Sequence, residues 1–249
     1  SKEYGKLSGQ KIEELRIGAR IEPSEFKKHP LDFALWKAAK PGEPRWKSPW
    51  GEGRPGWHIE CSAMSMKYLG ETLDVHGGAT DLIFPHHENE IAQSEAATGK
   101  PFARYWFHVG LVTINKEKMS KSLKNFVSAR DVLKRYDAET VRLWVAMTHY
   151  RKPIDFNWDQ LDRVEKMLDR MYVSVFRALK AMESKEAGEL GDIGEKIDEF
   201  IKKFKNAMND DLNSPRAIVV LREIIEFLDK NLDILNKTQV EKIIDVIRE

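Results

Sequence analysis

The sequence has few of the features that mark secreted or membrane proteins. A single cysteine, Cys61, stands among 249 residues, so no internal disulfide can form, and we expect a reducing, cytoplasmic environment. No stretch approaches the ~18 consecutive apolar residues of a membrane span, and Ser1–Gln10 lacks the apolar core of a secretory signal. The net charge of +1 neither favours nor excludes a nucleic-acid partner. A packed protein of one large or two smaller domains, without a membrane partner, is the expectation.

Residue types that build functional sites are concentrated in the first part of the chain. All 7 Trp, all 7 His and the only Cys precede residue 160, together with most of the Pro and Gly. Ligands, aromatic rings and turn formers in one region indicate that sites are built there. The remainder reads as helical scaffold, which places a domain boundary near residues 158–160.

Apolar residues in the tail recur with the helical period of 3.6. Ser214 and Pro215 are typical of an N-cap followed by the first helical residue, and Thr238 with Glu241 suggests a capping box. Short breaks, including one around residues 188–194, separate the stripes, so the sequence predicts four antiparallel helices in a bundle. The apolar stripes are Leu161, Val164, Leu168, Met171, Val175, Leu179 and Met182; Ile197, Phe200, Ile201, Phe204 and Met208; Ile218, Leu221, Ile225, Leu228, Leu232 and Leu235; and Val240, Ile243, Ile244 and Ile247.

The first part of the chain has a mixed pattern. Ile12–Ile21 is compatible with a short helix or with irregular structure, and Lys40–Gly56 is rich in Pro, Gly and Trp. Tyr105–Ile114 has the β-branched and aromatic bias of a strand. Asp131–Tyr136 and Ala138–Met147 are expected to be helical.

The run Lys118-Met119-Ser120-Lys121-Ser122 is one candidate functional segment. Two lysines and two hydroxyl groups on a loop supply charges and donors suited to a polyphosphate. For an arbitrary lysine-rich run, a solvated surface turn is the alternative. The five residues together match the Lys-Met-Ser-Lys-Ser loop of class I aminoacyl-tRNA synthetases.

A second candidate lies in Phe84-Pro-His-His-Glu-Asn-Glu90. If Pro85 opens a helix, His86 and Glu90 fall one turn apart on the same face. With Cys61 they offer sulfur, nitrogen and oxygen ligands, a set that suits zinc. The alternatives are a surface hydrogen bond between His86 and Glu90, and a cysteine that only fills space in the core.

Several longer stretches closely resemble the cysteinyl-tRNA synthetase family, and the resemblance covers almost the whole chain. It implies an α/β fold: the C-terminal half of a Rossmann-type nucleotide-binding domain followed by an all-α helical bundle. It divides the chain into a connecting segment (1–46), the second Rossmann half (47–115), the lysine loop with a stem-contact region (116–158) and a bundle of the anticodon-binding type (159–249). The stretches are Tyr4–Ser8, Ser48–Gly51, Gly53–Met64, Asp74–Gln93, Lys118–Ser122 and Asn209–Pro215.

The resemblance also assigns roles to single residues. Cys61, His86 and Glu90 match three of the family's four zinc ligands, but the chain has no second cysteine for the fourth. The family's His-Ile-Gly-His motif is also missing, so the chain resembles half of an enzyme and is expected to be inactive alone. Trp57 matches a tryptophan at the floor of the substrate pocket, with core packing as its alternative. Residues matching ATP-binding positions are Gly77, Gly78, Asp81, His108, Lys118, Met119, Ser120, Lys121 and Ser122, with Lys118 and Lys121 as catalytic residues.

In this family, cysteine is activated with ATP and Mg²⁺ and transferred to tRNA(Cys), while Zn²⁺ selects the substrate thiol. The resemblance therefore implies cysteine, ATP and tRNA(Cys) as partners of a cytoplasmic monomer. For RNA contact in the tail, Lys202, Lys203 and Lys205 are candidates, although a solvated helix face explains them equally well. Two other functions stay open: the related cysteine ligase of mycothiol biosynthesis, and a non-catalytic tRNA-binding remnant.

Overall fold

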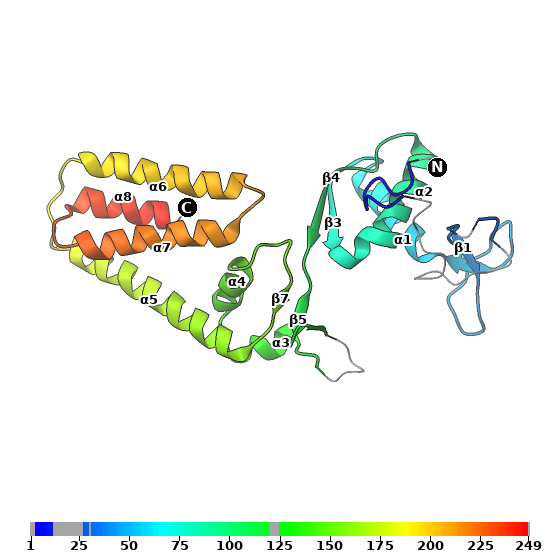
Figure 1. The fold of residues 1–249 in the computed structure, drawn as a ribbon, viewed down its shortest axis with the longest axis horizontal. Coiled ribbons are helices and arrows are strands. Elements are labelled where there is room, and N and C mark those ends of the chain that lie inside the picture. Colours follow the sequence, from blue (N-terminus) through cyan, green and yellow to red (C-terminus); the bar gives the residue numbers. More distant parts are fainter. Residues whose placement is uncertain (1–2, 12–26, 30, 120–124, 249) are drawn as a thin grey trace. The chain divides into compact units, whose positions relative to one another are not determined.

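The computed structural model describes residues 3–11, 27–29, 31–119 and 125–248. The segment Ile12–Ile21 lies outside them. The chain divides into two compact units, Ser1–Val109 and Gly110–Glu249 (Figure 1). None of the described helices combines the length and apolar character that crossing a membrane requires.

A pair of parallel strands organises the first unit. β3 (Leu73–Ala79) runs parallel to β4 (Ala103–Val109), and α2 (Glu88–Thr98) lies in the connection between them. Parallel neighbours need such a crossover because the chain must return to the same end of the sheet. α1 (Trp57–Leu69) packs against α2. The buried side chains Leu73, Ile91 and Phe102 form the small core beneath these elements.

The Pro/Gly/Trp-rich run forms most of a small hairpin. β1 (Trp36–Ala38) pairs antiparallel with β2 (Gly53–Pro55). Gly56 then leads directly into α1, and its N–H donates to the carbonyl of Leu35. The hairpin is therefore joined to the start of the helix that carries Cys61.

The segment before the hairpin is anchored on α2 by a buried carboxylate. Glu88 is fully buried, and its oxygens accept hydrogen bonds from the backbone N–H groups of Gly5, Leu7 and Ser8. The Tyr4 hydroxyl donates to Asn89 Oδ1. Because a buried carboxylate without partners is strongly unfavourable, these bonds account for the position of Glu88 and hold residues 4–8 on the helix.

The second unit begins with short strands and helices. β5 (Val112–Ile114) lies between β6 (Glu117–Lys118) and β7 (Ile154–Asp155), antiparallel to β6 and parallel to β7. α3 (Ala129–Val132) and α4 (Ala138–Ala146) lie between β6 and β7 in the chain. The strand predicted over Tyr105–Ile114 is thus two strands, interrupted at Gly110, whose N–H donates to the Tyr150 carbonyl. The helix predicted over Asp131–Tyr136 begins earlier, because Ser128 caps it by accepting from the N–H of Asp131, and it ends at Val132.

The four-helix prediction for the tail is confirmed. The helices are α5 (Trp158–Met182), α6 (Asp192–Asn209), α7 (Ser214–Asn231) and α8 (Lys237–Arg248). They enclose one apolar core whose members include Ala178, Ile197, Phe200, Val220, Ile224, Leu228, Leu235, Val240, Ile243 and Ile244. The compact unit begins at Gly110 rather than at residues 158–160, since Leu161 and Val164 of α5 share a second core with α3 and α4.

Two predicted helix caps differ from the observed ones. Asn213, not Ser214, caps α7, and its side chain accepts from the N–H of Arg216. The capping box of α8 consists of Asn236 and Gln239, each of which accepts the backbone N–H of the other. An asparagine supplies the same acceptor oxygen as serine or threonine, so the tertiary path of the chain decides between neighbouring candidates.

Candidate metal centre

Three predicted ligands come from adjacent elements of the first unit. Cys61 lies in α1, Glu90 in the first turn of α2, and His86 in the tight turn Ile83–His87 that precedes α2. The α-helix begins at Glu88 rather than at Pro85, and Phe84 interrupts the helical geometry. His86 and Glu90 nevertheless face the same side, because the turn continues smoothly into the helix.

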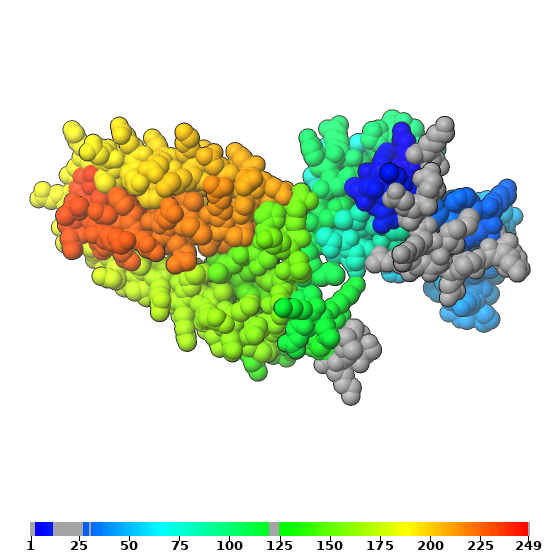
Figure 2. Space-filling view, viewed as in Figure 1, coloured from blue at the N-terminus to red at the C-terminus, as the bar shows by residue number. Residues whose placement is uncertain are grey.

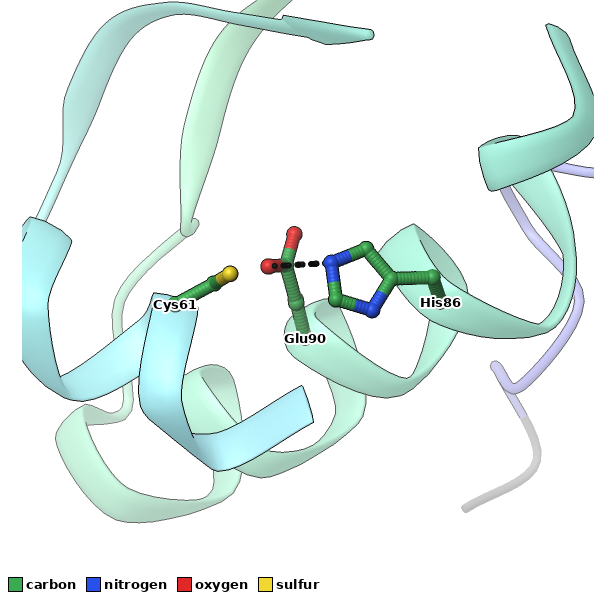
Figure 3. Close-up of side chains that lie close together, drawn as sticks. All are labelled: Cys61, His86 and Glu90. Atoms are coloured by element: carbon green, nitrogen blue, oxygen red, sulfur yellow. Dashed lines mark ion pairs between the residues drawn. The ribbon is translucent and has the colours of Figure 1, made fainter. Parts of the chain in front are cut away.

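The ligand atoms of Cys61, His86 and Glu90 converge (Figure 3). They all lie within 4.8 Å of one another, and His86 Nε2 is 3.1 Å from Glu90 Oε1. His86 and Glu90 are buried and Cys61 is half-buried. The structure therefore brings the three predicted ligands together.

Glu90 is a fully buried carboxylate with two distinct oxygens. Oε2 lies 2.8 Å from His76 Nε2, with which it is hydrogen-bonded. Within the described residues no hydrogen bond reaches Oε1, although His86 lies beside it. Burial opposes the negative charge of Glu90, but the interactions with His76 and His86 outweigh it and lower its pKa to about 2. The carboxylate is therefore charged at neutral pH and has one oxygen available for a cation.

The candidate ligand His86 is oriented by a second histidine. His58 Nδ1 and His86 Nδ1 are 2.8 Å apart, so one ring donates to the other. Burial, together with the neighbouring His86, lowers the pKa of His58 to about 4. A neutral His58 can accept the Nδ1 proton of His86, which leaves the His86 Nε2 lone pair facing Glu90 and Cys61.

The thiol is not ionised by its surroundings alone. Burial raises the pKa of Cys61, and the Glu90 carboxylate raises it further. A thiol, an imidazole nitrogen and a carboxylate oxygen held this close form the mixed ligand set that zinc accepts, and the free Oε1 of Glu90 lacks only a positive partner. The three residues fit a zinc ion, whose charge would also lower the pKa of the thiol.

A second histidine pair lies on the other side of Glu90. His87 Nδ1 is 2.8 Å from His108 Nε2, and both side chains are buried. Burial lowers the pKa of His87 to about 4. His76, His87 and Glu90 form another group whose ligand atoms lie within 4.8 Å of one another. Glu90 thus belongs to both groups, the one with Cys61 and His86 and the one with His76 and His87.

The residues that match ATP-binding positions in this unit lie along β3 and β4. Gly77 and Gly78 are opposite Phe107 and His108, and Asp81 is in the turn Thr80–Leu82. A Cβ atom at Gly77 would lie 2.3 Å from the Phe107 carbonyl oxygen, and one at Gly78 would lie 2.9 Å from Leu82 Cδ1. Packing against the strand backbone therefore requires glycine at position 77, whereas a side chain at position 78 requires the Leu82 side chain to shift.

Other candidate residues are partly described. Lys118 is exposed in β6 of the second unit, and Met119 is half-buried, whereas Ser120, Lys121 and Ser122 lie outside the described residues. Trp57 opens α1 with 70% of its surface exposed, so core packing does not explain it. Its indole contacts the His86 ring edge-on at 6.4 Å between centroids.

Sequence reasoning missed His58 and His76 as members of this site. His58 lies three residues before Cys61, so the spacing places both on one face of a helix, and this was a usable signal. No local signal identifies His76, since only the pairing of β3 with β4 brings it over α2.

Comparison with known proteins places this geometry in a family. Residues 1–166 match the family described as tRNA synthetases class I (C) catalytic domain, and residues 203–249 match the DALR domain. Cysteine--tRNA ligase of Thermodesulfovibrio yellowstonii is 55% identical over 235 residues, covering 93% of this chain and 48% of its own length. The enzyme of the same name from Carboxydothermus hydrogenoformans is 53% identical over 240 residues, covering 96% of this chain and 51% of its own length. The chain thus spans about half the length of these curated relatives.

A solved structure supports the fold. This structure is the ternary complex of Agrobacterium radiobacter K84 agnB2 LeuRS with tRNA and LeuAMS. Its LeuRS chain superimposes on this chain with a TM-score of 0.64 at 16% identity. The match covers 82% of this chain and 31% of that one. The predicted fold class, an α/β synthetase half followed by a helical bundle, is therefore confirmed. With its family match over residues 1–166, the chain belongs to the class I tRNA synthetase (C) family.

Proposed function

We propose that this chain is the zinc-binding half of an enzyme that activates cysteine with ATP and transfers it to tRNA(Cys). The observation that carries the proposal is the convergence of Cys61, His86 and Glu90. Relatives named cysteine--tRNA ligase, at 50 to 55% identity, support the same reaction. The mycothiol-type ligase is not favoured, because the relatives carry the tRNA ligase name and residues 203–249 match the DALR domain.

Substrate selection rests on the three ligands. Cys61, His86 and Glu90 would hold zinc, which supplies a soft Lewis acid that prefers a thiolate to a hydroxyl group. Such a preference separates cysteine from serine by more than the roughly 1–3 kcal/mol that differences of one small group provide in an apolar pocket. The exposed indole of Trp57, beside His86, is available to contact the substrate side chain.

The reaction has two transfers. The carboxylate of cysteine attacks the α-phosphorus of ATP, and pyrophosphate leaves as cysteinyl-adenylate forms. A hydroxyl at the 3′ end of tRNA then attacks the acyl carbon, and AMP leaves. Lys118 and Lys121 would neutralise the developing charge on pyrophosphate, helped by the hydroxyls of Ser120 and Ser122, and Met119 of the same loop would contact the nucleotide.

The nucleotide would lie along the segment 47–115. Gly77 and Gly78 would allow close approach of the adenosine, Asp81 would accept from ribose hydroxyls and His108 would line the adenine pocket. Residues 1–46 would connect this part to the rest of the enzyme, 116–158 would carry the lysine loop, and 159–249 would contact tRNA. We further propose a cytoplasmic location, in keeping with the single cysteine, and a monomeric state.

The test is a spectroscopic measurement on the purified 249-residue chain. Loaded with Co²⁺ in place of zinc, it should gain thiolate-to-metal absorption when cysteine is added and none when serine is added. Cys61→Ser and Glu90→Gln should lower the bound metal, measured by mass spectrometry. Equal responses to cysteine and serine, or no metal bound by the parent chain, would contradict the proposal.

A second measurement addresses the chain in isolation. We expect no cysteine-dependent ATP–pyrophosphate exchange from it, because Cys61 is its only cysteine and one zinc ligand of the family has no counterpart. Robust exchange would show that the 249 residues form a complete activation site.

A further inference from the structure

A second group of candidate ligands lies beside the second oxygen of Glu90. It consists of His76, His87 and Glu90, whose ligand atoms lie within 4.8 Å of one another. β3 supplies His76, the turn before α2 supplies His87, and α2 supplies Glu90. The cyan to blue-green atoms of these elements pack closely together (Figure 2). The packing of β3 on α2 therefore creates this group.

The distances in the group suit a single divalent cation. Two ligand atoms that bind one zinc-sized ion, each at about 2.0–2.1 Å, lie roughly 3 Å from each other. His76 Nε2 and Glu90 Oε2 are 2.8 Å apart, close to the 3.1 Å between His86 Nε2 and Glu90 Oε1 in the first group. The hydrogen bond between His76 and Glu90 thus holds both ligand atoms where a cation would take the place of the proton between them.

The ring of His87 is positioned by its neighbours. His87 Nδ1 lies 2.8 Å from His108 Nε2 on β4, and both side chains are buried. Histidines that bind metals commonly have their second nitrogen fixed by such a partner. A Cβ atom at Gly78 would lie 3.0 Å from His87 Cε1, so glycine leaves the space that the ring occupies. His87 is therefore held beside His76, with 5.1 Å between the two ring centroids.

The carboxylate of Glu90 can serve two cations. It is fully buried, and its ion-pair partners among the described residues, His76 and His86, carry a charge only when protonated. A buried negative charge is unfavourable unless a positive charge lies beside it. One oxygen of Glu90 faces His86, and the other points away from it (Figure 3). Each oxygen has lone pairs of its own, so one cation can bind at each of them, as in two-metal sites of enzymes.

We propose that His76, His87 and Glu90 form a second metal site for a borderline divalent cation such as Co²⁺, Ni²⁺ or Zn²⁺, and that Glu90 bridges the two ions. Two imidazoles and a carboxylate are ligands that such cations accept. The second ion binds more weakly than the first, because it has no thiolate ligand and the first ion repels it. The site does not rest on the proposed reaction, since its ligands need neither ATP nor tRNA.

The test counts the Co²⁺ ions that the full 249-residue chain binds as the free metal concentration is raised in a chelator buffer. The parent should bind two ions in two steps. The first step should give thiolate-to-metal absorption, and the second should add visible Co²⁺ absorption without further thiolate absorption.

Four variants assign the two steps. His87→Phe, which keeps an aromatic ring of similar size, should lose the second step and retain the thiolate absorption. Cys61→Ser should lose the thiolate absorption and retain the second step. Glu90→Gln should weaken both steps about ten-fold or more, because both ions share this residue. The matched control His149→Phe, in the second unit, should bind metal like the parent.

The outcomes separate this site from the proposed function. A parent chain that binds one Co²⁺ ion with thiolate absorption overturns the second site and leaves the proposed function in place. A second step that persists in His87→Phe also overturns it, as does a Glu90→Gln variant that changes only the first step. If the first ion binds but responds equally to cysteine and serine, the proposed function fails, whereas a second step that His87→Phe removes still supports this site. All variants should retain the parental circular dichroism spectrum, and the count in the parent decides without them.

Discussion

Arg151 and Asp211 form a two-bond ion pair that fastens the loop between α6 and α7 to the segment before β7. Arg151 Nη2 donates to Asp211 Oδ1 at 2.9 Å, and its Nε donates to Oδ2. The Tyr150 hydroxyl donates to the same carboxylate at 2.7 Å. Asp211 has a φ of +55°, a left-handed conformation that few side chains tolerate. Within the second unit, this aspartate links the bundle to the strands.

Two replacements of Asp211 should distinguish the stability that comes from its ion pair with Arg151 from the strain of its left-handed backbone conformation. Asparagine tolerates the left-handed conformation, so Asp211→Asn removes only the ion pair and should lower the melting temperature of the second unit modestly. Asp211→Ala adds conformational strain and should lower it further. Since the pKa of Asp211 is held below its usual range mainly by Arg151, the stabilisation is present above about pH 4 and is lost as the pH falls through the folded value. Calorimetry at low and high salt checks this, because high salt should narrow the gap between parent and Asp211→Asn. Equal melting temperatures for both variants would contradict the strain argument.

His76 positions the candidate metal ligand Glu90 without belonging to the triad of Cys61, His86 and Glu90. His76→Leu removes the hydrogen bond to Glu90 Oε2 and should lower zinc affinity about 10- to 100-fold. His76→Gln, which can still donate, should lose less. Competition with a chromogenic chelator measures the affinity, and His149→Gln in the second unit is the control. An unchanged affinity in His76→Leu would show that Glu90 is held by other contacts.

Gly77 should not tolerate a side chain. A Cβ atom there would lie 2.3 Å from the Phe107 carbonyl oxygen, which belongs to the paired strand and cannot move aside. We expect Gly77→Ala to cost about 1–3 kcal/mol of unfolding free energy in the first unit. Gly194→Ala is the matched control, since its Cβ would meet only Leu190 Cβ at 3.8 Å and should be neutral or slightly stabilising. Urea titrations of both variants decide the point, and equal effects would refute the steric explanation.

The observed capping box of α8 predicts which residue matters at its start. Asn236→Ala removes the acceptor for the Gln239 N–H and should cost about 1 kcal/mol. Glu241→Ala, in the box that the sequence pattern suggests, should have little effect. Thermal unfolding of the two variants tests this prediction. A larger loss of stability in Glu241→Ala would support the capping box of Thr238 and Glu241 instead.

We expect the folded chain to lose stability at high pH because of Tyr136. The hydrogen bond that its hydroxyl donates to Asp162, with burial, raises the pKa of Tyr136 to about 12. Below about pH 10 the tyrosine is neutral in both states, so its contribution is fully present. As the pH rises from about 10 to 12, only the unfolded tyrosine ionises, and stability is lost. Tyr136→Phe should therefore show a flatter decline between pH 9 and 11 in urea unfolding, and Asp162→Asn an intermediate one. Parallel curves for parent and Tyr136→Phe would contradict the assignment.

Local patterns determined much of the fold. The period of 3.6 was sufficient for α5 to α8 because an amphipathic stripe has to face a core whichever neighbours supply it. The bias of Tyr105–Ile114 correctly indicated strand structure, but the break at Gly110 depends on Tyr150, forty residues further along the chain. The sequence pattern placed the cap of α7 at Ser214, whereas the structure has Asn213, whose side chain offers an equivalent acceptor oxygen.

The candidate site divides in the same way. By itself the sequence indicated the candidate ligands, Cys61, His86 and Glu90, and determined the one-turn spacing of two of them. Only the tertiary structure decided that α1 packs on α2 so that the thiol reaches this pair, and that β3 carries His76 to the far oxygen of Glu90. It also decided that Lys203 of α6 pairs with Glu223 of α7. Spacing along one helix is a local property, whereas burial, ion pairing and the meeting of separate elements depend on which surfaces pack together.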